Sequence, residues 1–228
     1  MARNRFTANQ LPPEILRRLA GLSAGIEQSF NTFRGRIGGK SYSNNELLER
    51  LAASDDTAVR KQCWEALKQV GEAVAPRLVE LAVLRNEGAR KLGFADYREM
   101  EIRLQEHDPA MLEGIFAELE ELTREPFTAM KAKLDAELAR RFGVEPAELM
   151  PWHYDNPFFQ SAPPAAAVDL DEFYRGMEKE DLPPLAQDFF AGLGMPVGGI
   201  LERSSLYERP GKDQHAFCED MDRAGDVR

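Results

Sequence analysis

The longest helical pattern in the chain is residues 57–92, TAVRKQCWEALKQVGEAVAPRLVELAVLRNEGARKL. Its apolar residues recur at steps of three and four positions, which is the spacing of one face of an α-helix. This stripe consists of Leu67, Val70, Val74, Leu78, Leu81 and Leu84. Pro76 lies within it and removes a backbone donor, so we expect a kink there. The stretch predicts a long amphipathic helix.

Similar patterns lie on both sides of this stretch. In residues 11–35 the apolar side chains recur at helical spacing, which predicts a helix. Gly35 and the Gly38-Gly39 pair are expected to end it. Ser43 stands three residues before Glu46, which predicts a capping box at the start of the next helix. A shorter helix is expected in residues 94–106, before the next cap.

More helices are expected after residue 107. Asp108-Pro109 predicts a capped helix start, and Pro126 later interrupts the pattern, which indicates two helices or one bent helix. Asp169 with Glu172 predicts another cap, and residues 181–194 read as a last helix that stops at Gly194.

Strand signals are scarce. The candidate is QHAFCEDMD, residues 214–222, followed by AGDVR, residues 224–228, with Gly225 in the turn. The fold class expected is mainly α, with a short β element near the C-terminus.

Composition limits the functional classes. Hydrophobic residues make up 43% and charged residues 30%, as in ordinary soluble globular proteins. The net charge of −10 argues against nucleic-acid binding, because phosphate contacts need a basic face. The sequence has no long apolar run and no signal-peptide pattern, so we expect a cytoplasmic protein without membrane attachment. Cys63 and Cys218 are far apart and lack metal-ligand spacing, which favours reduced thiols over a disulfide.

Residues 151–160, PWHYDNPFFQ, hold five aromatic rings when the imidazole of His153 is counted. Two readings are open: His153 as a ligand or base, or an aromatic plug that holds helices together. A helical zinc peptidase needs two histidines one helical turn apart, with a glutamate between them. His107, His153 and His215 are widely separated, so the residues predict no metal site and no catalytic residue in this chain.

The stretch that begins at His215 is expected to be extended within a helical protein. Such a strand needs a sheet partner or a ligand for its edge amides. A peptide-binding edge and a buried structural hairpin both remain open on this ground.

Several segments, taken in order, resemble a known family. These are FFAGLG (189–194), SSLYERP (204–210), HA (215–216) with Asp220 five residues after the histidine, and GDVR (225–228). Upstream, LRNEGARKLGFADYREM (84–100) and PWHYDNPFF (151–159) continue the similarity. Together they resemble the gluzincin zinc peptidases of the angiotensin-converting-enzyme type and of the thimet oligopeptidase and oligopeptidase F group. The resemblance extends over most of the chain.

The resemblance implies a helical, groove-containing peptidase fold and a peptide substrate. His215 and Ala216 would be substrate-binding, since the corresponding strand runs along the substrate in that family. Trp152 and Tyr154 would border the groove, and His153 would lie in a buried aromatic cluster and not at zinc. The zinc cofactor of the full-length family enzymes is held by an HExxH helix and a later glutamate, which these 228 residues do not contain.

Residues 1–228 are therefore expected to be a single helical region, a fragment of a larger zinc-peptidase domain. Alone it would be inactive, and the missing C-terminal half could associate in trans. The alternative is a non-catalytic, all-helical binding or scaffold domain derived from the same fold. An HExxH encoded closely downstream would favour the peptidase, and its absence would favour the scaffold.

Overall fold

The computed structural model describes residues 2–156, 170–209, 211–213 and 216–227. The chain divides into two compact units, Met1–Ser161 and Ala162–Arg228. Among the described residues, no helix is both long enough and apolar enough to cross a membrane.

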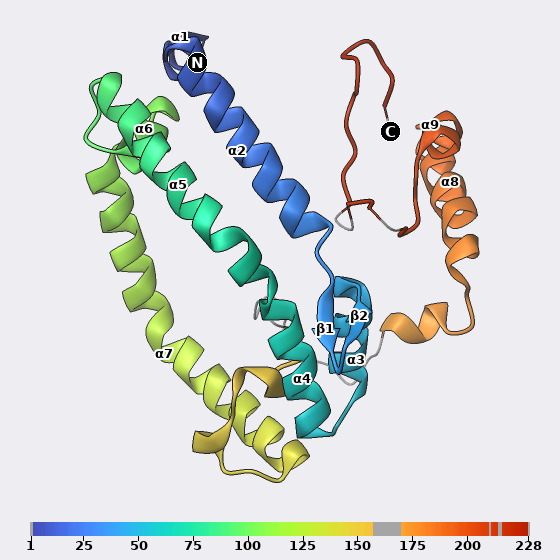
Figure 1. Cartoon of the computed structure of the whole chain (residues 1–228). Coiled ribbons are helices and arrows are strands. Elements are labelled where there is room, and N and C mark those ends of the chain that lie inside the picture. The colour runs from blue at the N-terminus through green and yellow to red at the C-terminus, as the bar shows by residue number, and fades with distance from the viewer. Residues whose placement is uncertain (1, 157–169, 210, 214–215, 228) are drawn as a thin grey trace. The chain divides into compact units, whose positions relative to one another are not determined.

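One part of the first unit is a helix layer. It contains α1 (Ala2–Ala8), α2 (Pro13–Asn31), α5 (Val70–Lys91) and α6 (Tyr97–Leu104). Helices α2 and α5 pack along their lengths, as Figure 1 shows, with Ile26, Val74 and Leu81 buried between them. The apolar stripes of the sequence therefore supply this core, and the mainly helical fold class is confirmed.

The other core of the first unit forms between α3 (Asn44–Ala53) and α4 (Thr57–Lys68). It buries Leu47, Leu51, Cys63 and Ala66 almost completely. The expected capping box is present: the Ser43 hydroxyl accepts from the Glu46 N–H at 3.2 Å, and Glu46 accepts from the Ser43 N–H at 2.7 Å. Local capping thus fixes where α3 begins.

Residues 57–92 form two helices, α4 and α5, that are interrupted at Gln69. Helix α5 is continuous through Pro76, so the kink expected there does not divide the helix and stays a prediction, whereas the interruption at Gln69 was not expected. The Gln69 carboxamide accepts from the Arg36 N–H at 2.8 Å and donates to the Arg36 carbonyl at 3.0 Å. This tertiary pairing with residue 36 accompanies the interruption.

Residue 36 belongs to a hairpin that the sequence reading missed. Strands β1 (Gly35–Ile37) and β2 (Lys40–Tyr42) pair antiparallel, with Arg36 opposite Ser41. Gly38 and Gly39, read as a helix stop, have φ values of 57° and 82°, as a two-residue type I′ turn requires. The two-stranded sheet therefore lies early in the first unit's sequence, where no β element was expected.

The last part of the first unit is α7 (Pro109–Phe142), followed by the 3₁₀ turns η1 (Pro146–Glu148) and η2 (Pro151–His153). Asp108 caps α7 by accepting from the Ala110 N–H at 3.1 Å, as expected. Pro126 lies inside one continuous helix, so of the two alternatives the single helix is confirmed. Its axis changes direction along its length (Figure 1).

The second unit contains η3 (Leu170–Tyr174), η4 (Lys179–Asp181), α8 (Leu182–Gly192) and α9 (Gly198–Arg203). Helix α8 ends as expected, with Gly194 at φ 76°, but α9 follows it, so α8 is not the last helix. Asp169, expected in a cap, lies outside the described residues. The part of the expected C-terminal hairpin that can be described is one antiparallel bridge between Asp220 and Val227, with Gly225 at φ 107°.

The close approach of β1 to α4 yields a stability prediction. A Cβ added to Gly35 would lie 2.6 Å from the Ala66 carbonyl oxygen and 2.7 Å from Leu47 Cδ1. Gly35→Ala should therefore lower the free energy of unfolding by about 1–3 kcal/mol or more through overpacking. The measurement is urea denaturation followed by circular dichroism.

The control is Gly71→Ala in α5, where an added Cβ would meet nothing within 4 Å. Because alanine is the better helix former, this variant should gain roughly 0.5–1 kcal/mol. Equal stabilities for the two variants would contradict the account of the β1–α4 contact.

Candidate functional site

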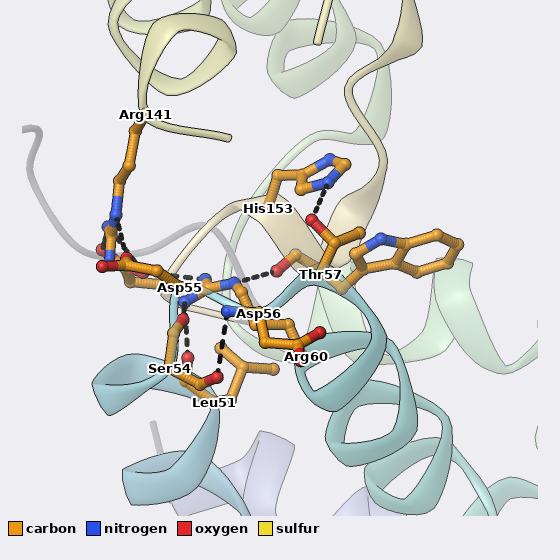
Figure 2. A network of polar contacts seen from close by, with 10 residues as sticks. Leu51, Ser54, Asp55, Asp56, Thr57, Arg60, Arg141 and His153 are labelled. Carbon is orange, nitrogen blue, oxygen red and sulfur yellow. Dashed lines mark hydrogen bonds and ion pairs between the residues drawn. The ribbon is translucent and has the colours of Figure 1, made fainter. Parts of the chain in front are cut away.

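The most densely bonded polar site in the first unit surrounds Arg60 of α4, whose side chain is fully buried. Its Nε donates to the Trp152 carbonyl oxygen at 2.7 Å (Figure 2). Its Nη1 donates to the carbonyl oxygens of Leu51 at 2.5 Å and Ser54 at 2.9 Å. Its Nη2 forms an ion pair with Asp155 Oδ1 at 2.8 Å. One guanidinium thus joins α4 to two other segments, residues 51–54 and residues 152–155.

The acceptors explain why an arginine occupies this buried position. Leu51 lies in the last turn of α3, where helix carbonyls have no partner within the helix. The Trp152 carbonyl lies in η2, a short turn with few internal bonds. A planar group with five N–H donors in fixed directions can serve all of these acceptors at once, which a lysine ammonium cannot. Arg60 therefore ties the end of α3 and the 150–155 segment to α4.

A second guanidinium, from Arg141 near the end of α7, extends the network. It donates through Nε to Asp55 at 2.8 Å and through Nη1 to Asp155 Oδ2 at 3.3 Å (Figure 2). Partial burial works against the charge of Arg141, but the bonds to Asp55 and the charge of Asp155 outweigh it and raise the pKa of Arg141. Asp155 therefore bridges two cations, one from α4 and one from α7.

His153 lies at the centre of the aromatic cluster and is only 2% exposed. Its ring centroid is 4.9 Å from that of Phe142, at the end of α7. Nδ1 accepts from the Met150 N–H at 2.8 Å, so the proton of the neutral ring lies on Nε2, which is 3.5 Å from the Thr57 hydroxyl. Burial, and then the charge of Arg60, lowers the pKa of His153. The expectation that His153 lies in a buried aromatic cluster between helices is confirmed.

Tyr154 belongs to a separate polar group on α7. Its hydroxyl donates to Asp135 Oδ1 at 2.7 Å and accepts from Lys131 Nζ at 2.7 Å. Burial raises the pKa of Tyr154, and the hydrogen bond and charge of Asp135 act in the same direction. Although partial burial opposes its charge, bonds to Asp135 and Tyr154 raise the pKa of Lys131. The Tyr154 hydroxyl is therefore already engaged within the first unit.

Trp152 packs edge-on against Trp64 of α4, with ring centroids 5.9 Å apart. Lys61 Nζ lies 5.3 Å from the Trp152 ring centroid, within cation–π range. The indole N–H groups of Trp64 and Trp152 are buried without an acceptor among the residues described. Of the two aromatic residues expected at a groove, Trp152 is thus the one whose polar group has no partner in the described part of the chain.

The other expected substrate-binding residues belong to the second unit. Ala216 is exposed and lies in no helix or strand, a few residues before the bridge at Asp220. His215 lies outside the described residues. Substrate binding by His215, Ala216, Trp152 and Tyr154 stays a prediction.

A zinc site would need several ligand side chains close together. Within the described ranges, no three His, Cys, Asp or Glu side chains are grouped as a metal site would require. Both ring nitrogens of His153 already face polar protein groups, so this histidine does not suit a metal. The side chains described here do not fit a zinc site.

Sequence reasoning missed Arg60, Asp155 and the Lys131–Asp135 pair. One signal was present: Arg60 occupies the same helix face as Cys63 and Leu67, where a charged residue is unusual unless it is paired. Its acceptors were not predictable, because backbone carbonyls carry no sequence signature.

No protein-family model matches this chain, and a search of curated proteins found no match.

The buried, neutral His153 predicts a pH dependence of stability. Its folded-state pKa lies below the ordinary value near 6.5, so the unfolded chain binds a proton more readily. The free energy of unfolding should be unaffected by His153 above about pH 6.5 and should fall as pH drops from there through the folded-state pKa. Urea denaturation between pH 7.5 and 4.5 measures it.

His153→Asn keeps an acceptor for the Met150 N–H but cannot titrate, so its profile should be flatter in this window. His107→Asn, which removes an exposed histidine, is the matched control. A His153→Asn profile parallel to that of the wild type would show that His153 does not carry the effect.

Arg60 yields a second prediction from this site. Arg60→Lys should cost about 2–4 kcal/mol of unfolding free energy, because a single ammonium leaves buried carbonyls unpaired. The same change at Arg98, whose ion pair with Glu113 is exposed, should cost less than about 1 kcal/mol. Similar losses for both variants, measured by thermal and chemical denaturation, would refute a special role for Arg60.

Proposed function

We propose that this chain forms the substrate-binding part of a zinc-dependent peptidase and holds an extended peptide along residues 215–219. The observation that carries the proposal is the exposure of Ala216–Glu219 directly before the antiparallel bridge of Asp220 with Val227. An extended peptide can add to such an edge through main-chain hydrogen bonds.

The register of the bridge supports Ala216 as a binding position. The Met221 N–H donates to the Asp226 carbonyl at 3.0 Å, so the backbone of residue 221 faces the returning strand. In an extended strand the N–H and C=O groups of alternate residues point to opposite sides. If residues 216–219 continue this geometry when a peptide binds, Ala216 and Cys218 face the open edge and Phe217 faces the inner side.

Residues 84–100, one segment on which the resemblance rests, have a defined local structure. Here α5 turns into α6: Asn86 Oδ1 accepts from the Tyr97 N–H at 3.0 Å, and Asp96 accepts from the Glu99 N–H at 2.8 Å. Gly93 has a φ of 89° within the turn. In this proposal these residues build the framework and do not contact peptide.

Hydrolysis would need a further polypeptide, because the chain contains no HExxH and its described side chains do not suit zinc. The proposal for this chain is therefore peptide binding, with zinc chemistry supplied by that polypeptide in cis or in trans. The alternative is a non-catalytic binding or scaffold domain. It would bind peptide at the same edge but gain no activity from any adjoining segment, and an HExxH encoded closely downstream would argue against it.

The test of peptide binding is amide hydrogen exchange resolved by NMR, with and without a library of blocked synthetic octapeptides. Addition of the library should slow exchange at Ala216 and Cys218 and leave Phe217 nearly unchanged, because only the first two face the open edge. Equal protection of all three amides, or none at saturating peptide, would refute binding at this edge.

Ala216→Pro and Phe217→Pro form the matched pair for this experiment. Each removes one backbone donor, but only the residue 216 donor is expected to meet the peptide. Ala216→Pro should weaken binding by roughly 5- to 150-fold, the effect of about 1–3 kcal/mol, while Phe217→Pro should bind nearly as the wild type does.

A further inference from the structure

Helix α7 has a long apolar stripe that nothing covers in the described part of the chain. The helix packs on α6 near its start and on η1 near its end. Every residue from Glu113 to Met130 is exposed. The stripe consists of Met111, Ile115, Leu119, Leu122 and Met130, which recur at helical spacing and are each at least 41% exposed. Contiguous apolar surface of this kind marks an interaction site.

The charge of α7 is divided between its two halves. Residues 109–125 carry five glutamates and one arginine, a net charge of −4. Residues 127–142 carry four basic and two acidic residues, a net charge of +2. A second α7 that runs antiparallel places each acidic half against a basic half, whereas a parallel copy places like charges together.

Side-chain size is divided in the same way. The first half of the stripe has only large residues, and the second half presents the exposed alanines Ala129, Ala132 and Ala136 beside Met130. Ala129 and Ala132 also line a shallow hollow of about 460 Å³ on the surface of this helix. Small residues opposite large ones let two helices approach closely and interdigitate.

Full overlap of two antiparallel α7 helices defines one register. A twofold axis at the middle of the helix pairs Pro109 with Phe142, and residue numbers that face each other then add up to 251. Leu122 meets Ala129 of the second copy, Leu119 meets Ala132, and Ile115 meets Ala136. Each contact occurs twice, so large residues cover the small ones on both sides of the axis.

The same register also brings together two charged residues that have no ion pair within the described part of one chain. Glu118 meets Lys133 of the second copy, and neither makes an ion pair with another residue in the described ranges. By contrast, Arg124 already pairs with Glu120 and Glu121, and Lys131 pairs with Asp135. We propose that α7 is a self-association surface, on which two copies of this chain pair as antiparallel helices about a twofold axis near Pro126.

Charge exchange at Glu118 and Lys133 tests the pairing on the full chain. Sedimentation equilibrium should show a reversible dimer for the wild type. Glu118→Lys and Lys133→Glu should each raise the dimer Kd at least about tenfold, because like charges then meet twice per dimer. The double variant Glu118→Lys/Lys133→Glu should restore the wild-type Kd, and Glu120→Lys, off the stripe, should change it little.

Cysteine cross-linking in a Cys218→Ser background tests the orientation. Leu122→Cys/Ala129→Cys should form a disulfide-linked dimer, and Leu122→Cys alone should not, because the two copies of residue 122 are apart in an antiparallel pair. Ready cross-linking of Leu122→Cys alone would indicate parallel packing and overturn the proposal. The proposal would also be overturned if the chain were monomeric at all concentrations, or if neither charge variant changed the dimer Kd. Either result would assign the stripe to another partner.

Discussion

The buried guanidinium of Arg60 is the interaction on which the arrangement of the first unit depends. It is fully enclosed, and it donates to the carbonyl oxygens of Leu51, Ser54 and Trp152 while pairing with Asp155. Removing a charge from water is costly unless it is well paired and hydrogen bonded, and these four acceptors meet that condition. The carbonyl groups, in turn, have lost their water and need a donor. Donor and acceptors therefore constrain one another.

The surrounding contacts build on this junction. The Phe142 ring lies 4.9 Å from the Arg60 guanidinium carbon, and Asp155 also binds Arg141, so the end of α7 is held as well. His153 completes the packing as a neutral ring, because its burial, and then the positive charge of Arg60, disfavour the protonated form. The middle of α7 has no such anchors among the described residues, and its exposed stripe is free to contact a second copy. Helix α7 is thus anchored at one end and exposed along its middle.

Features that depend on residues close together in the sequence could be predicted, and features that depend on tertiary contacts could not. The caps at Ser43 and Asp108 were predicted correctly, because each depends on residues within one helical turn. The Gly38-Gly39 turn was missed, although two adjacent glycines between short alternating segments are a hairpin signal, because the strands are only three residues long. The interruption at Gln69, which accompanies its pairing with the backbone of Arg36, and the acceptors of Arg60 could not be predicted, since backbone groups carry no sequence signature. The candidate site was therefore only partly visible: the aromatic cluster was expected, and the arginine that organises it was not.

Native-state hydrogen exchange measures the central claim, that Arg60 makes the 150–155 segment part of the α3–α4 core. The Met150 N–H donates to His153 Nδ1 and the His153 N–H donates to the Met150 carbonyl at 2.9 Å, so both amides report on that segment. The account predicts that these amides open with the same free energy as the buried Cys63 amide of α4, and well above the Glu120 amide in the exposed middle of α7. If the Met150 and His153 amides exchange as readily as that of Glu120, the junction does not hold the segment and the account is wrong.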